Sequence, residues 1–565
     1  MAGWQRVMRT KLRQALSEPR VAALLGILSV ALALRLWGIG FGLPYAYHFD
    51  EPTYVSAALN LGSGIIGRQP NPTGFSNILF GEYAAYFVAG RLGGLFASAA
   101  DFERAYRTDP SVFLLLGRLT NAVLGTLSVL VAYWLGRQVR GQLVGLLAAL
   151  FLTMAFLHVR DSHYAVPDVA MAFFVSLSVL SCILTVQRTS RRCQYLAAAA
   201  GGFAIATKWS AWPIVIPLAL AVLYDRLVRR ETMQISRPGR ATLAGLTPFV
   251  GGFLVGGFQL LLKPATYLNY ALHEWQADEA GGFGIWQVDT VPGWWFYLKT
   301  LSYGLGIVLL TLAILGFLGR LVSAVRTRDR VSILLLSFPL LYFLLMGSTR
   351  HYFARYALPL APFMALFAAE AVAAAVGWMR AKQGATLGWS LMALPVVVAI
   401  AQPLTCSIRH DMLLTRQDTR TLAKQWIEAN IPEGVKIAVD WPVHGPPLST
   451  PERAAPNSER VYDVTIVGGT GLADHPIEWY REQGFDYLIA SSFIYQIPLV
   501  FPEQDRVRRA FYESLGRELT EVQVFSPTAD GSEPDFVFDE IYGPAVSLWQ
   551  RERPGPTIKI YKINQ

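Results

Sequence analysis

Residues 158–187, HVRDSHYAVPDVAMAFFVSLSVLSCILTVQ, place a cluster of ionisable side chains directly before a long apolar segment. No side chain from Val169 to Leu180 carries a charge, and residues 168–187 are long enough to cross the hydrocarbon core of a bilayer as one helix. Ionisable groups at the edge of such a helix are costly to keep near lipid, so they indicate a functional role by default. The pattern predicts a membrane-spanning helix with a charged entrance.

The composition of the whole chain also indicates a membrane protein. Of the 565 residues, 53% are hydrophobic and only 16% are charged, and the mean hydropathy is positive. A soluble protein of this length needs more polar surface. The formal charge of +9 is also typical of proteins that bind nucleic acid, but the basic residues lie between apolar stretches, as in cytoplasmic loops of membrane proteins. We therefore expect membrane lipid, and no nucleic acid, as a partner.

Eleven membrane crossings follow when the basic loops are taken as cytoplasmic. The apolar run 21–41 follows several arginines and has no cleavage site after it, which predicts an uncleaved anchor and a cytoplasmic N-terminus. Residues 78–100 are predicted to lie along the outer surface as an amphipathic helix, and 195–226 to cross twice with a turn near Lys208. The other predicted spans are 113–136, 141–157, 168–187, 241–263, 294–319, 331–347, 355–379 and 385–404.

This topology divides the chain into a transmembrane domain, residues 1–404, and a soluble extracytoplasmic domain, residues 405–565. The second part holds 23 acidic residues against 16 basic ones, whereas the first has a net positive charge. A helix is predicted from Asp418 to Asn430, and strands at 435–439, 461–467, 487–490 and 557–563. The predicted fold class is therefore mostly α: a polytopic transmembrane helical bundle of about 11 spans, with an extracytoplasmic C-terminal α/β domain.

Two acidic motifs are candidates for catalysis. Asp50 and Glu51 follow the first span, where an Asp shielded from bulk water could act as general base for an acceptor hydroxyl or amine. A solvated loop is the alternative interpretation of this pair. Asp168 begins a span, where the helix dipole stabilises an acid. A simple helix cap is the alternative there.

A third candidate group is cationic. Lys208 lies at the predicted hairpin turn, and Arg350, His351 and Arg355 precede a later span. Lys and Arg at this depth would hold the phosphate of a lipid-linked leaving group. Each of them alone is equally well explained as a snorkelling anchor. Several cations on the same face favour an anion site, and acids and cations together are what a glycosyl phosphate donor requires.

The order of these motifs resembles that of the GT-C fold glycosyltransferases, in particular the protein O-mannosyltransferase and aminoarabinose transferase group (glycosyltransferase family 39-like). The similarity covers roughly residues 20–405. It rests on the acidic pair after the first span and on four later segments: Arg118–Arg137, Ser162–Asp168, Ala204–Lys208 and Arg355–Leu360.

The resemblance implies an inverting transfer of a hexosyl or pentosyl group from a dolichyl- or undecaprenyl-phosphate sugar, on the outer face of a multi-pass plasma membrane protein. Asp50 would be the catalytic base, with Glu51 beside it and Asp168 as a second acidic residue. The group implies no firm cofactor, although its oligosaccharyl transferase branch suggests an alternative in which Asp50 and Asp168 ligate a divalent cation. The candidate substrate-binding residues are Arg160, His163, Lys208, Arg350, His351, Arg355 and Tyr356.

Two other classes of protein compete with a glycosyltransferase. A polytopic transporter also buries ionisable groups, but it more often shows internal repeats with paired broken helices, which this sequence lacks. A non-catalytic cell-envelope assembly protein has no need for acids and cations on one face. The acceptor stays open between protein, lipid and glycan, and we expect residues 273–295, rich in Trp and Gly, to contact donor or acceptor.

Overall fold

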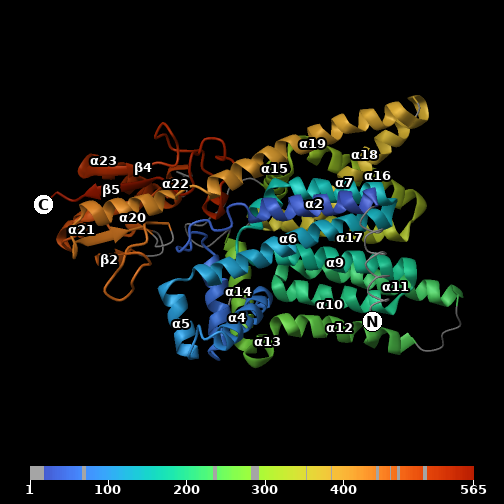
Figure 1. The fold of residues 1–565 in the computed structure, drawn as a ribbon, viewed down its shortest axis with the longest axis horizontal. Coiled ribbons are helices and arrows are strands. Elements are labelled where there is room, and N and C mark those ends of the chain that lie inside the picture. The colour runs from blue at the N-terminus through green and yellow to red at the C-terminus, as the bar shows by residue number, and fades with distance from the viewer. Residues whose placement is uncertain are drawn as a thin grey trace.

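The structure is a computed structural model that describes residues 18–66, 72–232, 238–280, 292–350, 353–383, 385–440, 444–458, 460–467, 471–500 and 505–564. Figure 1 shows a bundle of long helices and, at one end of it, a smaller part that contains the strands. Helix α19 (Ala385–Leu414) leads from the bundle to this second part and continues past residue 404, where the sequence predicts the domain boundary.

The first half of the bundle begins with α2, whose Pro19 occupies the first turn, where a missing N–H costs nothing. The helices of this half are α2 (Pro19–Leu36), α3 (Glu51–Gly62), α4 (Gly74–Leu92), α5 (Ala99–Thr108), α6 (Ser111–Arg140), α7 (Gln142–Met154), α8 (Phe156–Asp161), α9 (Pro167–Arg188), α10 (Arg191–Thr207), η1 (Trp209–Ile214) and α11 (Val215–Thr232).

The second half completes the bundle. Its elements are α12 (Pro238–Gly257), α13 (Gln259–Leu262), α14 (Pro264–Ala280), α15 (Gly293–Leu305), α16 (Ile307–Thr327), α17 (Arg330–Ser348), η3 (Ala354–Leu360), α18 (Ala361–Gln383) and α19. Helix α18 packs between α16, α7 and α6, and its phenylalanines and alanines belong to the largest hydrophobic core.

Seven helices among the described residues are long and apolar enough to cross a membrane. They are Pro19–Leu36, Ser111–Arg140, Pro167–Arg188, Trp209–Leu227, Ile307–Thr327, Arg330–Ser348 and Ala354–Lys382. Two shorter apolar helices, Gln142–Met154 and Leu246–Gly257, accompany them. The mostly helical fold class is confirmed, whereas the count of about 11 spans stays a prediction.

The structure divides the predicted span 294–319. The sequence predicts a single crossing at 294–319, but α15 ends at Leu305 and α16 begins at Ile307. Gly306 between them has φ +85°, a left-handed conformation that L side chains rarely adopt. A Cβ at Gly306 would also lie 2.9 Å from Cδ of Pro403. The glycine therefore ends one helix and starts the next at a close contact with α19.

The C-terminal part is a five-stranded sheet with helices. Its elements are α20 (Thr419–Asn430), β1 (Lys436–Val439), β2 (Asp463–Ile466), η4 (Leu472–Asp474), α21 (Ile477–Glu482), β3 (Tyr487–Ser491), α22 (Ser492–Val500), α23 (Arg506–Glu518), β4 (Thr520–Phe525), η5 (Phe538–Tyr542) and β5 (Ile558–Lys562). The strand order is β2-β1-β3-β5-β4; β1 pairs in parallel with β2 and β3, whereas β5 is antiparallel to β3 and β4. The predicted helix and four strands are confirmed, and β4 was not predicted.

The C-terminal part contacts the segment that joins α2 to α3. The Tyr47 hydroxyl lies 2.7 Å from the Thr421 hydroxyl, and the Tyr45 hydroxyl donates to the Pro456 carbonyl over 3.0 Å. The Arg420 guanidinium lies 3.9 Å from the centre of the Tyr47 ring. These contacts seat the α/β part on the segment that leads directly to Asp50.

Candidate functional site

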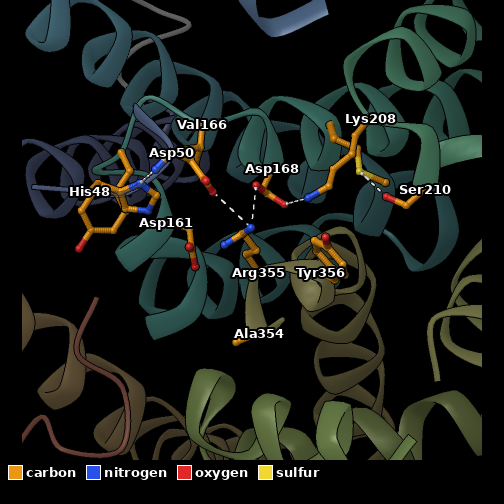
Figure 2. A network of polar contacts seen from close by, with 12 residues as sticks. His48, Asp50, Asp161, Val166, Asp168, Lys208, Ser210, Ala354, Arg355 and Tyr356 are labelled. Atoms are coloured by element: carbon orange, nitrogen blue, oxygen red, sulfur yellow. Dashed lines mark hydrogen bonds and ion pairs between the residues drawn. The ribbon is translucent and has the colours of Figure 1, made fainter. Parts of the chain in front are cut away.

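Four ionisable side chains from four separate elements meet where the bundle faces the C-terminal part. Asp50 is the N-cap of α3, and Asp168 lies in the first turn of α9. Lys208 is the C-cap of α10, and Arg355 is in η3. Figure 2 shows Arg355 pointing toward both carboxylates, with Lys208 reaching Asp168 from the other side.

The charges alternate in sign along this four-residue cluster. Nη2 of Arg355 lies 3.2 Å from Oδ2 of Asp50, and Nε of Arg355 lies 3.9 Å from Oδ2 of Asp168. Asp168 also forms an ion pair with Nζ of Lys208. Each carboxylate therefore faces a cation, which reduces the cost of burying the charges.

Asp50 is the most exposed acid of the cluster. Its side chain is 22% exposed, against 4% for Asp168. Burial raises the pKa of Asp50 above its ordinary value, and the nearby Arg355 charge offsets part of that rise. A partly open carboxylate with a raised pKa is a more effective proton acceptor than an ordinary surface aspartate.

Aromatic rings enclose the two cations. The Lys208 ammonium lies 4.1 Å from the centre of the Tyr356 ring. The Arg355 guanidinium lies 3.9 Å from the centre of the Tyr542 ring and 4.4 Å from that of Phe353. Nη1 of Arg355 is buried and has no hydrogen-bond partner among the described residues. The cluster thus contains a fixed cation with one donor nitrogen still available to an anion.

Glu51 has different surroundings from Asp50, although the two are neighbours in sequence. Its carboxylate accepts two hydrogen bonds from Arg118, each of 2.7 Å, and a third of 2.9 Å from the Ala165 backbone N–H. Both side chains of this ion pair are fully buried. The pair joins α3 to α6 and to the chain segment before α9, which carries Asp168.

Two other predicted substrate-binding residues, Arg160 and His163, contact protein groups. Arg160 is fully buried and forms ion pairs with Asp161 and Asp539. The His163 ring lies 2.9 Å from the Val159 carbonyl and 3.0 Å from the Trp37 carbonyl, with Asp411 at 3.5 Å. The structure therefore gives both residues protein partners.

Of the remaining predicted residues, Tyr356 contacts the cluster through Lys208. Arg350 is exposed two residues beyond the end of α17, and His351 lies outside the described residues. Of the tryptophans predicted to contact substrate, Trp294 packs on α17 and donates to the Leu344 carbonyl over 3.2 Å. Trp286 and the side chain of Trp275 also lie outside the described residues.

The alternative in which Asp50 and Asp168 share a divalent cation does not fit the donor set. The Arg355 guanidinium contacts both carboxylates, and Lys208 neutralises Asp168 from the other side. An ion held by both acids would lie beside two fixed positive charges. We therefore derive no step through a metal.

Three residues of the site were not found from the sequence: Arg118, Asp539 and Tyr542. Arg118 had a usable signal, because a charged residue inside an apolar run indicates a buried partner or a function. Asp539 and Tyr542 lie in a mixed apolar and acidic stretch of the C-terminal part, with no local pattern that links them to the bundle.

Two solved structures with a similar fold are of an oligosaccharyltransferase. The apo oligosaccharyltransferase of Archaeoglobus fulgidus gives a TM-score of 0.57 at 11% identity, over 97% of this chain and 89% of that one. A second structure, AglB from the same organism in complex with an inhibitory peptide and a dolichol-phosphate, gives 0.54 at 11% identity, over 96% and 88%. ArnT from Cupriavidus metallidurans bound to undecaprenyl phosphate gives 0.45 at 15% identity, over 84% and 94%.

The shared fold is that of the GT-C glycosyltransferases, so the chain is an integral membrane protein of the GT-C fold. Residues 84–250 match the family model of dolichyl-phosphate-mannose-protein mannosyltransferases. No curated protein matches the sequence. The fold and the family segment agree with the glycosyltransferase class that the order of motifs in the sequence implies.

Proposed function

We propose that this protein transfers a sugar from a polyprenyl phosphate donor to an acceptor hydroxyl or amine, with inversion at the anomeric carbon. The observation that carries the proposal is the four-residue cluster, in which a partly open carboxylate lies 3.2 Å from an arginine with an available donor nitrogen. A carboxylate to remove a proton and a cation to hold the departing phosphate are the two groups that this reaction requires.

In the proposed step, the acceptor oxygen or nitrogen attacks the anomeric carbon while Asp50 takes the acceptor's proton. The bond between the anomeric carbon and the phosphate oxygen breaks, and the polyprenyl phosphate leaves with that electron pair. Arg355 and Lys208 face the developing negative charge on the phosphate. Asp168 holds both cations in place by contacting one on each side.

We assign Glu51 a positioning role instead of a chemical one. Within the described part of the chain its hydrogen bonds come from Arg118 and the Ala165 N–H, and its side chain is fully buried. Glu51 opens α3, so its contact with Arg118 fixes the helix end at which Asp50 is the cap. The same pair holds the segment before Asp168 through Ala165. We also assign a positioning role to Arg160 and His163, because their contacts are with other protein groups.

The family model supports the donor class, because its description names dolichyl-phosphate-mannose. The AglB complex shows that a protein of similar fold holds a dolichol-phosphate. We propose a hexosyl or pentosyl phosphate lipid as donor, with the cluster and the C-terminal part on the outer face of the plasma membrane and the N-terminus in the cytoplasm. The positive-inside assignment of the basic loops supports this orientation.

The experiment that tests the function measures free polyprenyl phosphate released by purified protein in lipid nanodiscs. The panel contains dolichyl and undecaprenyl phosphates that carry hexoses or pentoses, each with and without a mixed acceptor fraction of membrane proteins, lipids and glycans. Acceptor-dependent release from at least one donor is expected. Movement of a labelled lipid or solute across the membrane without any release would instead favour the transporter interpretation.

A further inference from the structure

The C-terminal part sends one short helix into the candidate site. Helix η5 carries Asp539, and Oδ2 of this carboxylate accepts a hydrogen bond of 3.1 Å from Nη1 of Arg160 in α8. Its other oxygen, Oδ1, accepts a hydrogen bond of 2.8 Å from the backbone N–H of Ala354. Ala354 directly precedes Arg355, so Asp539 fixes the start of η3 at the residue beside the cation of the site.

Tyr542, at the end of the same helix, lies over that cation. The Arg355 guanidinium is 3.9 Å from the centre of the Tyr542 ring, which is 5% exposed. The ring also makes edge contacts with Phe353, at 5.5 Å between ring centres, and with Phe49, at 6.4 Å. Phe49 precedes Asp50, so one aromatic ring contacts both chain segments that carry the Asp50–Arg355 pair.

The segment that follows η5 is itself held rigidly. Glu540 accepts hydrogen bonds from the backbone N–H groups of Ala545 and Ser547, at 3.0 and 3.1 Å, and from the Ser547 hydroxyl. Arg551 forms an ion pair with the same carboxylate and donates to the Gly555 carbonyl. Glu540 and Arg551 are both buried. Tyr542 and Asp539 therefore project from a preformed loop.

We propose that Tyr542 and Asp539 are positioning residues of the transfer reaction, and that through them the C-terminal part holds Arg355 in its contact with Asp50. The inference rests on the proposed function, since it assigns Arg355 to the leaving phosphate. An arginine side chain has several rotatable bonds, and an aromatic face on one side with a fixed backbone below restricts it to one arrangement. The C-terminal part thus completes the site that the bundle begins.

A role in packing alone would have different consequences from this one. If Tyr542 only fills space, a leucine of similar bulk should preserve activity once the protein is folded. Tyr542 contacts Arg355 through its ring face and also through its hydroxyl. If the ring face is the main support, phenylalanine should preserve most of the activity and leucine should not. A looser Arg355 would also stop offsetting the effect of burial on Asp50, so the pKa of Asp50 would rise.

The test compares Tyr542→Leu, Tyr542→Phe and Asp539→Asn with Trp549→Ala, a control that removes an aromatic side chain, 61% exposed, from the same segment. Two quantities are measured on folded protein in nanodiscs: the pH profile of kcat/KM for polyprenyl phosphate release, and binding of undecaprenyl phosphate by native mass spectrometry. Tyr542→Leu is expected to lower kcat/KM by about 3- to 30-fold and to move the acid limb to higher pH. Asp539→Asn is likewise expected to lower kcat/KM and to move the acid limb to higher pH.

Phenylalanine at position 542 should restore most of the loss, and Trp549→Ala should behave as wild type. Equal kcat/KM values, acid limbs and lipid binding in wild type and Tyr542→Leu would overturn the positioning role. A wild type that releases no lipid from any donor and binds no undecaprenyl phosphate would overturn the proposed function itself. Wild-type release together with an unmoved acid limb in Tyr542→Leu would overturn only the inference about Tyr542.

Discussion

Replacing Glu51 with glutamine should lower the stability of the protein severely, because it leaves the Arg118 guanidinium buried without its counter-charge. The two side chains are fully buried and joined by two hydrogen bonds of 2.7 Å. Removing one partner of a buried ion pair typically costs about 3–5 kcal/mol. Nη1 of Arg118 would keep the carbonyls of Ile39 and Phe41, at 3.0 and 2.6 Å, so we expect the lower end, about 3 kcal/mol.

Thermal unfolding in detergent, followed with a thiol-reactive dye, measures this effect. Cys182 is a free cysteine, fully buried in α9, and becomes reactive when the bundle opens. An unfolding entropy of about 2.1 cal/mol/K per residue sums to about 1.2 kcal/mol/K over the 565 residues, so a loss of about 3 kcal/mol corresponds to a fall in Tm of roughly 2–3 °C. Arg118→Gln should show a similar fall, and the double variant should be less damaged than the sum of the two, because neither charge then stays unpaired.

One result would refute this account of Glu51. If Glu51→Gln unfolds at the wild-type temperature and yet releases no polyprenyl phosphate, the carboxylate acts in the chemistry and not through Arg118. Glu51 would then be the catalytic base, and Asp50 would be the positioning residue.

The remaining predictions concern turnover. Lys208→Met should raise the KM for donor by about tenfold, because a charge-assisted contact to phosphate is lost, and unchanged donor kinetics would exclude this role. EDTA should leave release unaltered because Arg355 lies against both acids; a loss restored by Mn²⁺ would show that an ion binds there. Asp50 must be ionised to accept a proton, and burial raises its pKa above 3.8, so kcat/KM should fall on acidification at a pH above that value. A profile flat down to pH 3.8 would exclude Asp50 as the base.

The helices and most strands could be predicted because their signals are local. Apolar runs of about 20 residues predict spans wherever they occur, and alternating apolar residues predict strands. The edge strand β4 was missed because its sequence, Thr520–Phe525, includes three polar residues among its first four and is only half-buried. The division at Gly306 depends on a close contact with Pro403, which no local pattern reports.

The cations and acids of the site were accessible from sequence because each interrupts or closely adjoins a predicted span. The separate role of each residue could not be predicted from the sequence. Asp50 and Glu51 are adjacent, but successive residues at a helix start project about 100° apart, so one joins Arg355 and the other Arg118. The contact of Tyr542 with Arg355, and that of Asp539 with Arg160 across 379 positions, depends on how the two parts of the chain dock.

The most direct test of the central claim is single-turnover release of polyprenyl phosphate by Asp50→Asn, with bound donor confirmed by native mass spectrometry. Asp463→Asn, which removes an exposed carboxylate on β2, is the matched control. We predict that Asp50→Asn binds donor as wild type does and releases lipid about 10²- to 10⁴-fold more slowly, while the control is unaffected. Release by Asp50→Asn at the wild-type rate would contradict the assignment of Asp50 as the catalytic base.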